Sequence, residues 1–81
     1  MKVKNRSVAS SWSAGIAANS HTGNFWTDGT KLYSYKLLIG DTTLDGVKVL
    51  RDHTARGRWN YHSQTTSCHV GYARPFADIL D

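Results

Sequence analysis

The chain has 81 residues, of which 40% are hydrophobic, and ten Lys and Arg against six Asp give it a formal net charge of +4. This length allows one hydrophobic core and no second domain. Three Trp, four Tyr and two Phe argue against a disordered chain, because large rings supply much of the burial that a short sequence can achieve. We therefore expect one folded domain over residues 1–81, with residues 1–6 as a flexible basic tail.

The cysteine content and the N-terminal sequence indicate where the protein resides. Cys68 is the only cysteine, so no disulfide can form within the chain, and a reducing compartment is expected. The basic N-terminus runs into Ser-rich amphipathic sequence instead of a long apolar stretch, which predicts neither a signal peptide nor a membrane span. Both features predict a cytoplasmic protein that does not bind membranes.

The first predicted element is a helix over residues 7–18. Val8, Trp12 and Ile16 recur every four positions, which places them on one helical face. Asn5 or Ser7 would cap its N-terminus, and residues 19–24 would form the loop after it.

A β-hairpin is predicted next, because residues 25–27 and 31–39 flank Asp28-Gly29, a dipeptide that tolerates the positive φ angles of tight turns. In the second strand, two tyrosines share one face with two aliphatic residues, and we expect this face to turn toward the core. Its members are Tyr33, Tyr35, Leu37 and Ile39.

Two further short strands are predicted after the turn-like residues 40–46. Residues 47–50 form the first of them, and residues 58–62 form the second. In the strand over residues 58–62 the side chains alternate. Trp59 and Tyr61 would point to one side, and Arg58, Asn60 and His62 would point to the other.

A second helix is predicted from residue 64 onward, since the run 64–67 offers hydroxyl caps before an apolar stripe spaced by four. Pro75 lacks a backbone N–H, so the helix should kink or break near Arg74, and a short final turn would cover residues 76–80. The predicted stripe consists of Cys68, Tyr72 and Phe76, with Val70, Ala73, Ala77 and Leu80 alongside it.

The order of these elements is α-β-β-β-β-α. It predicts an α+β fold in which a small antiparallel sheet of three to four strands is packed on one face by an N-terminal and a C-terminal helix.

Two motifs stand out in this order. Thr-Asp-Gly-x-x-Leu-Tyr-Ser-Tyr-x-Leu-x-Ile-Gly covers residues 27–40, and Ser-Gln-Thr-Thr-Ser-Cys-His-Val covers residues 63–70. Together they resemble a family of short tailed-bacteriophage proteins to which no activity is assigned. The resemblance implies a phage-encoded protein in the cytoplasm of an infected bacterium, where small phage proteins commonly bind nucleic acid or redirect a host protein.

A basic loop over residues 51–58 leads into aromatic residues, a pattern suited to nucleic acid, because guanidinium groups bind phosphates while rings stack on bases. The alternative is a solvated loop whose Trp59 and Tyr61 belong to the core. The first interpretation predicts a DNA or RNA partner and no cofactor. Its candidate binding residues are Lys48, Arg51, Arg56, Arg58, Trp59, Tyr61 and His62.

A second hypothesis is a protein-binding inhibitor or adaptor that acts on a host factor, either as a monomer or as a homodimer. In that case exposed Trp26, exposed Leu38 or the kinked C-terminus would matter more than charge.

Metal-binding and enzymatic interpretations have weaker patterns. The possible metal ligands lack the paired spacing of a zinc site, and the adjacent Cys68 and His69 would leave a helix about 100° apart. No Gly-x-Ser-x-Gly elbow or phosphate-binding glycine loop is present. The possible ligands are His53, His62, Cys68 and His69.

A third functional hypothesis is a small metal-dependent nuclease, because Asp52-His53, Asn60 and His69 imitate a His-Asn-His arrangement. Only six residues separate His53 from Asn60, however, too few for the usual long loop. We therefore expect a non-enzymatic protein.

Overall fold

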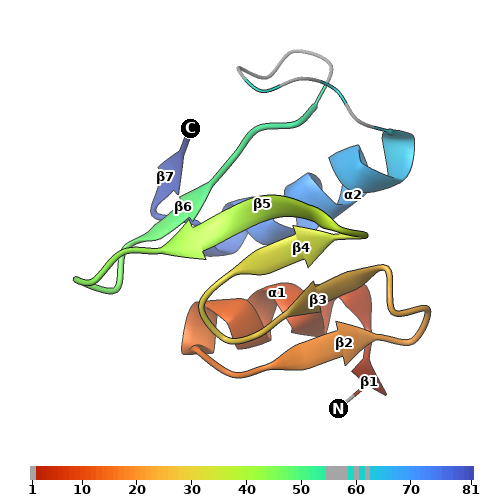
Figure 1. Cartoon of the computed structure of the whole chain (residues 1–81), viewed down its shortest axis with the longest axis horizontal. Coiled ribbons are helices and arrows are strands. Elements are labelled where there is room, and N and C mark those ends of the chain that lie inside the picture. The colour runs from red at the N-terminus through yellow and green to blue at the C-terminus, as the bar shows by residue number, and fades with distance from the viewer. Residues whose placement is uncertain (1, 55–58, 60, 62) are drawn as a thin grey trace.

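The computed structural model describes residues 2–54, 59, 61 and 63–81, which form a seven-stranded mixed sheet with two α-helices on one of its faces (Figure 1). The strands follow one another across the sheet in chain order. Its two outermost pairs, β1 with β2 and β6 with β7, are parallel, and the inner pairs are antiparallel. The α+β class is confirmed, while the sheet is larger than the predicted three to four strands and is mixed instead of antiparallel.

The elements have bounds that differ from the predicted ones at several points. Residues 2–6, expected to be a tail, lie in the first strand and in the first turn of the first helix. The bounds are β1 Lys2–Val3, α1 Asn5–Ala14, β2 Ala18–Ser20, β3 Phe25–Thr27, β4 Leu32–Ser34, β5 Leu37–Thr42, β6 Lys48–Leu50, α2 Gln64–Ala73, the 3₁₀-helix η1 Arg74–Phe76 and β7 Ile79–Leu80.

Helix α1 is shorter than predicted because Gly15 ends it. Gly15 adopts a left-handed conformation with φ of 77°, and its N–H donates to the carbonyl groups of the last turn. Ile16 therefore lies outside the helix and is 54% exposed, and Ala18 begins β2. The predicted capping by Asn5 or Ser7 is also wrong, since Lys4 occupies the N-cap and its side chain makes no capping hydrogen bond.

The hairpin of β3 and β4 around Asp28-Gly29 is confirmed. The Asp28 carboxylate accepts hydrogen bonds from the backbone N–H groups of Lys31 (2.8 Å) and Thr30 (2.9 Å), which lower the pKa of Asp28. Gly29 has φ of 101°, and a Cβ there would lie 2.8 Å from the carbonyl oxygen of Gly15. The turn therefore packs closely against the end of α1.

The predicted single strand over residues 31–39 is two strands. Tyr35 has φ of 57°, and the chain reverses there so that β4 and β5 pair antiparallel. Leu32 and Ser34 are fully buried, whereas Tyr33 is half-buried and Tyr35 is 39% exposed. The predicted inward face of Tyr33 and Tyr35 is therefore wrong.

The pairing register explains why the inward face is reversed. Phe25 and Thr27 of β3 are buried, and they pair with Ser34 and Leu32, respectively. Paired residues lie on the same face of a sheet, so the inward residues of β3 place Leu32 and Ser34 inward and Tyr33 outward.

Helix α2 begins within the predicted hydroxyl-rich run, and its predicted apolar face is confirmed in part, since Val70 and Ala73 are buried. The Ser63 side chain caps it and accepts a hydrogen bond from the Thr66 N–H. Cys68 and Tyr72 of the predicted stripe are exposed, whereas the helix buries Thr66, His69, Val70 and Ala73.

The helix ends where Pro75 predicts. Residues 74–76 continue as a 3₁₀-turn, and residues 79–80 form β7 instead of the predicted final helical turn. No helix among the described residues is long and apolar enough to cross a membrane.

The strand predicted over residues 58–62 lies mostly outside the described residues. Trp59 and Tyr61 are described, and neither belongs to a strand. The strand predicted over residues 47–50 is confirmed as β6.

The core lies between the sheet and the two helices. It consists of Val8, Ala9, Trp12, Phe25, Leu32, Ile39, Leu50, Val70 and Ala73. Gly40 of β5 lies against the Trp12 ring, since a Cβ there would be 2.9 Å from Trp12 Cζ2 and 3.0 Å from Leu32 Cβ.

We predict that Gly40→Ala lowers the free energy of unfolding by about 1–3 kcal/mol, because the methyl group overpacks the core beside Trp12. Gly71→Ala is the matched control. Gly71 lies in α2, and a Cβ there meets no atom within 4 Å, so this variant should gain about 0.5–1 kcal/mol. Urea denaturation of both variants tests whether Gly40 is packed against Trp12. Equal unfolding midpoints for Gly40→Ala and Gly71→Ala would contradict this packing.

Candidate nucleic-acid interface

A buried polar cluster joins the β4 strand to α2. The Ser34 hydroxyl lies 2.6 Å from His69 Nδ1 and 2.9 Å from Thr66 Oγ1. The His69 ring stacks on Phe25, with centroids 4.4 Å apart and planes 6° apart. Ser34 and Thr66 are fully buried and His69 is 3% exposed.

This cluster has the residue types of a serine–histidine pair, but its burial favours a structural role. A nucleophile must be reached by its substrate, and the Ser34 side chain is covered completely. Desolvation lowers the pKa of His69, so the ring stays neutral and can exchange a hydrogen bond with Ser34. The cluster also joins the two sequence motifs, since Ser34 lies in the first and His69 in the second.

The opposite face of the sheet is not covered by either helix (Figure 1). Because successive side chains of a strand alternate, the buried residues of each strand leave the ones between them on this outer face. Its central residues are Asn19, Trp26, Tyr33 and Val49. We call this surface the outer sheet face.

An ordered aromatic pair lies on the outer sheet face. Trp26 of β3 pairs with Tyr33 of β4, and their rings stack with centroids 4.1 Å apart and planes 12° apart. Trp26 Nε1 donates a hydrogen bond of 2.9 Å to the Tyr35 carbonyl oxygen. Both rings are half-buried, so this pair is rigid and partly accessible.

A second aromatic group lies at the β5–β6 end of the sheet. The Arg51 guanidinium lies over the Trp59 ring, 4.4 Å from its centroid, and Trp59 Nε1 is 3.3 Å from Asp81 Oδ2. A hollow of about 270 Å³ opens beside them. It is lined by Asp41, Thr42, Thr43, Val49, Arg51, Trp59 and Asp81.

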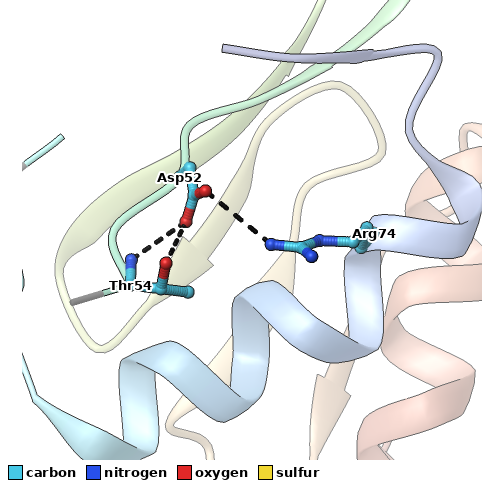
Figure 2. Close-up of polar contacts among 3 residues, drawn as sticks. All are labelled: Asp52, Thr54 and Arg74. Atoms are coloured by element: carbon cyan, nitrogen blue, oxygen red, sulfur yellow. Dashed lines mark hydrogen bonds and ion pairs between the residues drawn. The ribbon is translucent and has the colours of Figure 1, made fainter. Parts of the chain in front are cut away.

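The chain around the basic loop is anchored at Asp52, as Figure 2 shows in part. The Asp52 carboxylate accepts hydrogen bonds from the N–H (3.1 Å) and hydroxyl (2.5 Å) groups of Thr54, and it lies 3.7 Å from Arg74 Nη2. The Asp52 carbonyl oxygen accepts a hydrogen bond from the Trp59 N–H. Residues 52 and 59 are therefore adjacent.

The structure brings together two of the predicted binding residues, Arg51 and Trp59. Tyr61 is 53% exposed, but no contact joins it to them. The other predicted positions of the loop and strand lie outside the described residues. They are Arg56, Arg58 and His62.

Lys48 is a correction to the predicted site. It points inward and is 7% exposed, its Nζ donates to Thr42 Oγ1 at 2.7 Å, and it lies 5.5 Å from the Trp12 ring centroid. Desolvation lowers its pKa, and the charge of Asp78 opposes that shift. Lys48 is therefore part of the packing and does not present its charge to a phosphate.

The sequence pattern did not identify Tyr33 as a surface residue, because alternation alone assigned it to the core, and it named Trp26 only as an exposed residue of the adaptor hypothesis. A signal was present in β3, where Phe25 and Thr27 share a face and leave Trp26 alone on the other. If Thr27 pairs with Leu32 across the hairpin, Leu32 lies on the same face as Phe25 and Thr27, and Tyr33 lies on the other face beside Trp26.

The described residues contain no group of three side chains that could hold a metal ion. Two residues of the histidine patterns, His62 and Asn60, lie outside the described part of the chain. His53 is buried, with its ring 5.7 Å from Trp59.

Comparisons of the chain with protein-family models, with curated proteins and with solved structures found no match.

We predict that stability depends on pH through His69. Its folded-state pKa lies below the unfolded value of about 6.5, so the unfolded chain binds the proton first. The contribution of neutral His69 to the free energy of unfolding should be fully present above about pH 6.5. It should fall by up to about 1.4 kcal/mol per pH unit as the pH drops toward the folded-state pKa.

Urea midpoints measured between pH 8 and pH 5 test this prediction, with His69→Asn as the control that cannot titrate. The variant should be less stable at pH 8 and should lose part of the pH slope. An unchanged slope in the variant would show that another group causes the dependence.

Proposed function

We propose that this chain is a non-enzymatic nucleic-acid-binding protein that binds through its outer sheet face. One observation carries the proposal: the Trp26–Tyr33 stack lies on the face that the helices leave uncovered, and the Arg51–Trp59 pair lines a hollow together with Val49 of that face. Aromatic rings on a sheet surface offer stacking positions for bases, and arginine binds phosphates or stacks beside the rings.

The charge distribution supports this proposal. Lys31 lies in the turn before β4 and Lys36 in the turn after it, and both are exposed. Both flank β4, which carries Tyr33, while Arg51 lies over Trp59, and the whole chain carries a net charge of +4. Positive charge near a stacking surface attracts the phosphate backbone over a range of about one Debye length, roughly 8–10 Å.

We also propose that the protein is encoded by a tailed bacteriophage and acts in the cytoplasm of the infected cell. The support is the pair of sequence motifs, whose residues Ser34, Thr66 and His69 make one buried cluster. Motifs distant in sequence but joined in one contact are more specific than either motif alone.

A second candidate function is an adaptor or inhibitor that binds a host protein. The observation in its favour is the short strand β7 beside β6, where Ile79 and Leu80 are 50% and 45% exposed. A strand at the edge of a sheet can pair with an extended segment of another protein.

We predict that Arg51→Gln weakens nucleic-acid binding about threefold to tenfold at low salt, because one phosphate contact or one ring-stacked cation is lost. Arg6→Gln is the matched control, since Arg6 is an exposed cation of α1 in the helical layer. Fluorescence anisotropy with a labelled oligonucleotide at several salt concentrations measures both. If both variants lost the same affinity for the oligonucleotide, binding would depend on the net charge of the protein and not on Arg51 in particular.

Arg56 and Arg58, which lie outside the described residues, provide a second test of phosphate binding. Charge reversal in Arg56→Glu and Arg58→Glu should weaken binding further and make the salt dependence shallower, while circular dichroism shows an intact fold. If the affinity of the unmodified protein did not weaken from low to physiological salt, phosphate contact would be excluded as the main source of binding.

The adaptor function has its own test. The tagged protein is recovered from a bacterial lysate treated with nuclease, and bound proteins are identified. A stoichiometric host protein that remains after nuclease treatment and is lost in Leu80→Lys favours the adaptor. Its absence, together with oligonucleotide binding, favours the nucleic-acid interface.

A further inference from the structure

We infer that the nucleic acid bound at the outer sheet face is single-stranded and that one unpaired base stacks on the side of Trp26 that faces Asn19. This inference rests on the proposed function and specifies its ligand. It follows from the order of side chains across β2, β3 and β4.

Tyr33 covers one side of the Trp26 ring. Trp26 pairs with Tyr33 on one side and with Asn19 on the other. Tyr33 stacks against the first side at 4.1 Å. The opposite side therefore faces β2, where the paired residue Asn19 is exposed and has a short side chain.

The position of the Trp26 ring is held before any ligand binds. Its Nε1 donates to the Tyr35 carbonyl oxygen at 2.9 Å, and the stack with Tyr33 sets the orientation of its plane. A ring held in this way loses little conformational entropy on binding. Little of the favourable free energy of base stacking is therefore offset by the cost of fixing the ring.

Asn19 adds polar groups next to this stacking position. Its amide carries both donors and an acceptor, so it can bond to the edge of a base that lies on Trp26. The edges of unpaired bases are free for such bonds, as single-stranded ligands of aromatic sheet surfaces show generally.

A duplex fits this surface poorly. Bases inside a duplex have both faces covered by their neighbours, so none can stack on a tryptophan without being unpaired. Duplex binding also depends on many phosphate contacts, whereas the described cations beside the two aromatic groups are few, since Lys48 is buried and Lys31, Lys36 and Arg51 remain. The hollow next to Trp59 carries Asp41, whose carboxylate repels phosphate but can accept hydrogen bonds from base amino groups.

The experiment measures the affinity of the protein for two ligands at the same salt concentration. One is a fluorescein-labelled single-stranded oligothymidine, and the other is the duplex that this strand forms with oligoadenine. We expect the single strand to bind about tenfold more tightly or better. Trp26→Leu should weaken single-strand binding about tenfold, Trp26→Phe should retain most of it, and Tyr72→Leu should leave it unchanged. Tyr72 is the control because it is a half-exposed tyrosine in the helical layer.

Asn19→Ile leaves Trp26 in the chain and tests the assigned stacking position of the base directly. It therefore tests the inference even if Trp26→Leu fails to fold. An isoleucine there covers the side of the ring assigned to the base, so affinity for the single strand should fall while circular dichroism is unchanged. Unchanged affinity in Asn19→Ile overturns the assigned stacking position.

The outcomes distinguish this inference from the function on which it rests. Duplex binding that equals or exceeds single-strand binding, and that weakens in Arg51→Gln, overturns the inference while the proposed function stands. Absence of binding to either oligonucleotide at low salt overturns both.

Discussion

The packing of the Trp12 indole is the contact on which most of this fold depends. The ring is fully buried, and its Nε1 donates a hydrogen bond to the Thr30 carbonyl oxygen in the β3–β4 turn. Gly40 allows β5 to approach the ring, and the Lys48 ammonium lies over it. One side chain of α1 thus contacts three separate parts of the sheet, so its placement determines how the helix and the strands meet.

Two short helices can cover only one face of a seven-stranded sheet in a chain of this size. The second face is partly covered by its own side chains, since Trp26 and Tyr33 bury part of each other's surface by stacking. Such a stack gains free energy beyond simple burial, about 0.5–1.5 kcal/mol for an aromatic pair. The arrangement that stabilises an uncovered face therefore also leaves flat rings accessible at the surface, which is the basis of the proposed function.

Local sequence signals were reliable where one residue type has a single structural consequence. Asp28-Gly29 marked the hairpin turn, Pro75 marked the end of α2, and the hydroxyl-rich run after residue 62 marked its start. Among the predicted binding residues, Arg51 and Trp59 do lie together, and their role in binding stays a prediction. Lys48 was assigned wrongly, because a short strand does not reveal which of its faces the helices cover.

The sequence by itself determined the α+β class, the hairpin turn at Asp28-Gly29 and the richness in rings and positive charge. Only the tertiary structure decided which face of each element is buried. The reversal at Tyr35 and the pairing of Leu32 and Ser34 with the buried residues of β3 turned Tyr33 outward. Alternation specifies that two faces differ, but the choice between them depends on neighbouring strands and helices that pack from distant parts of the chain.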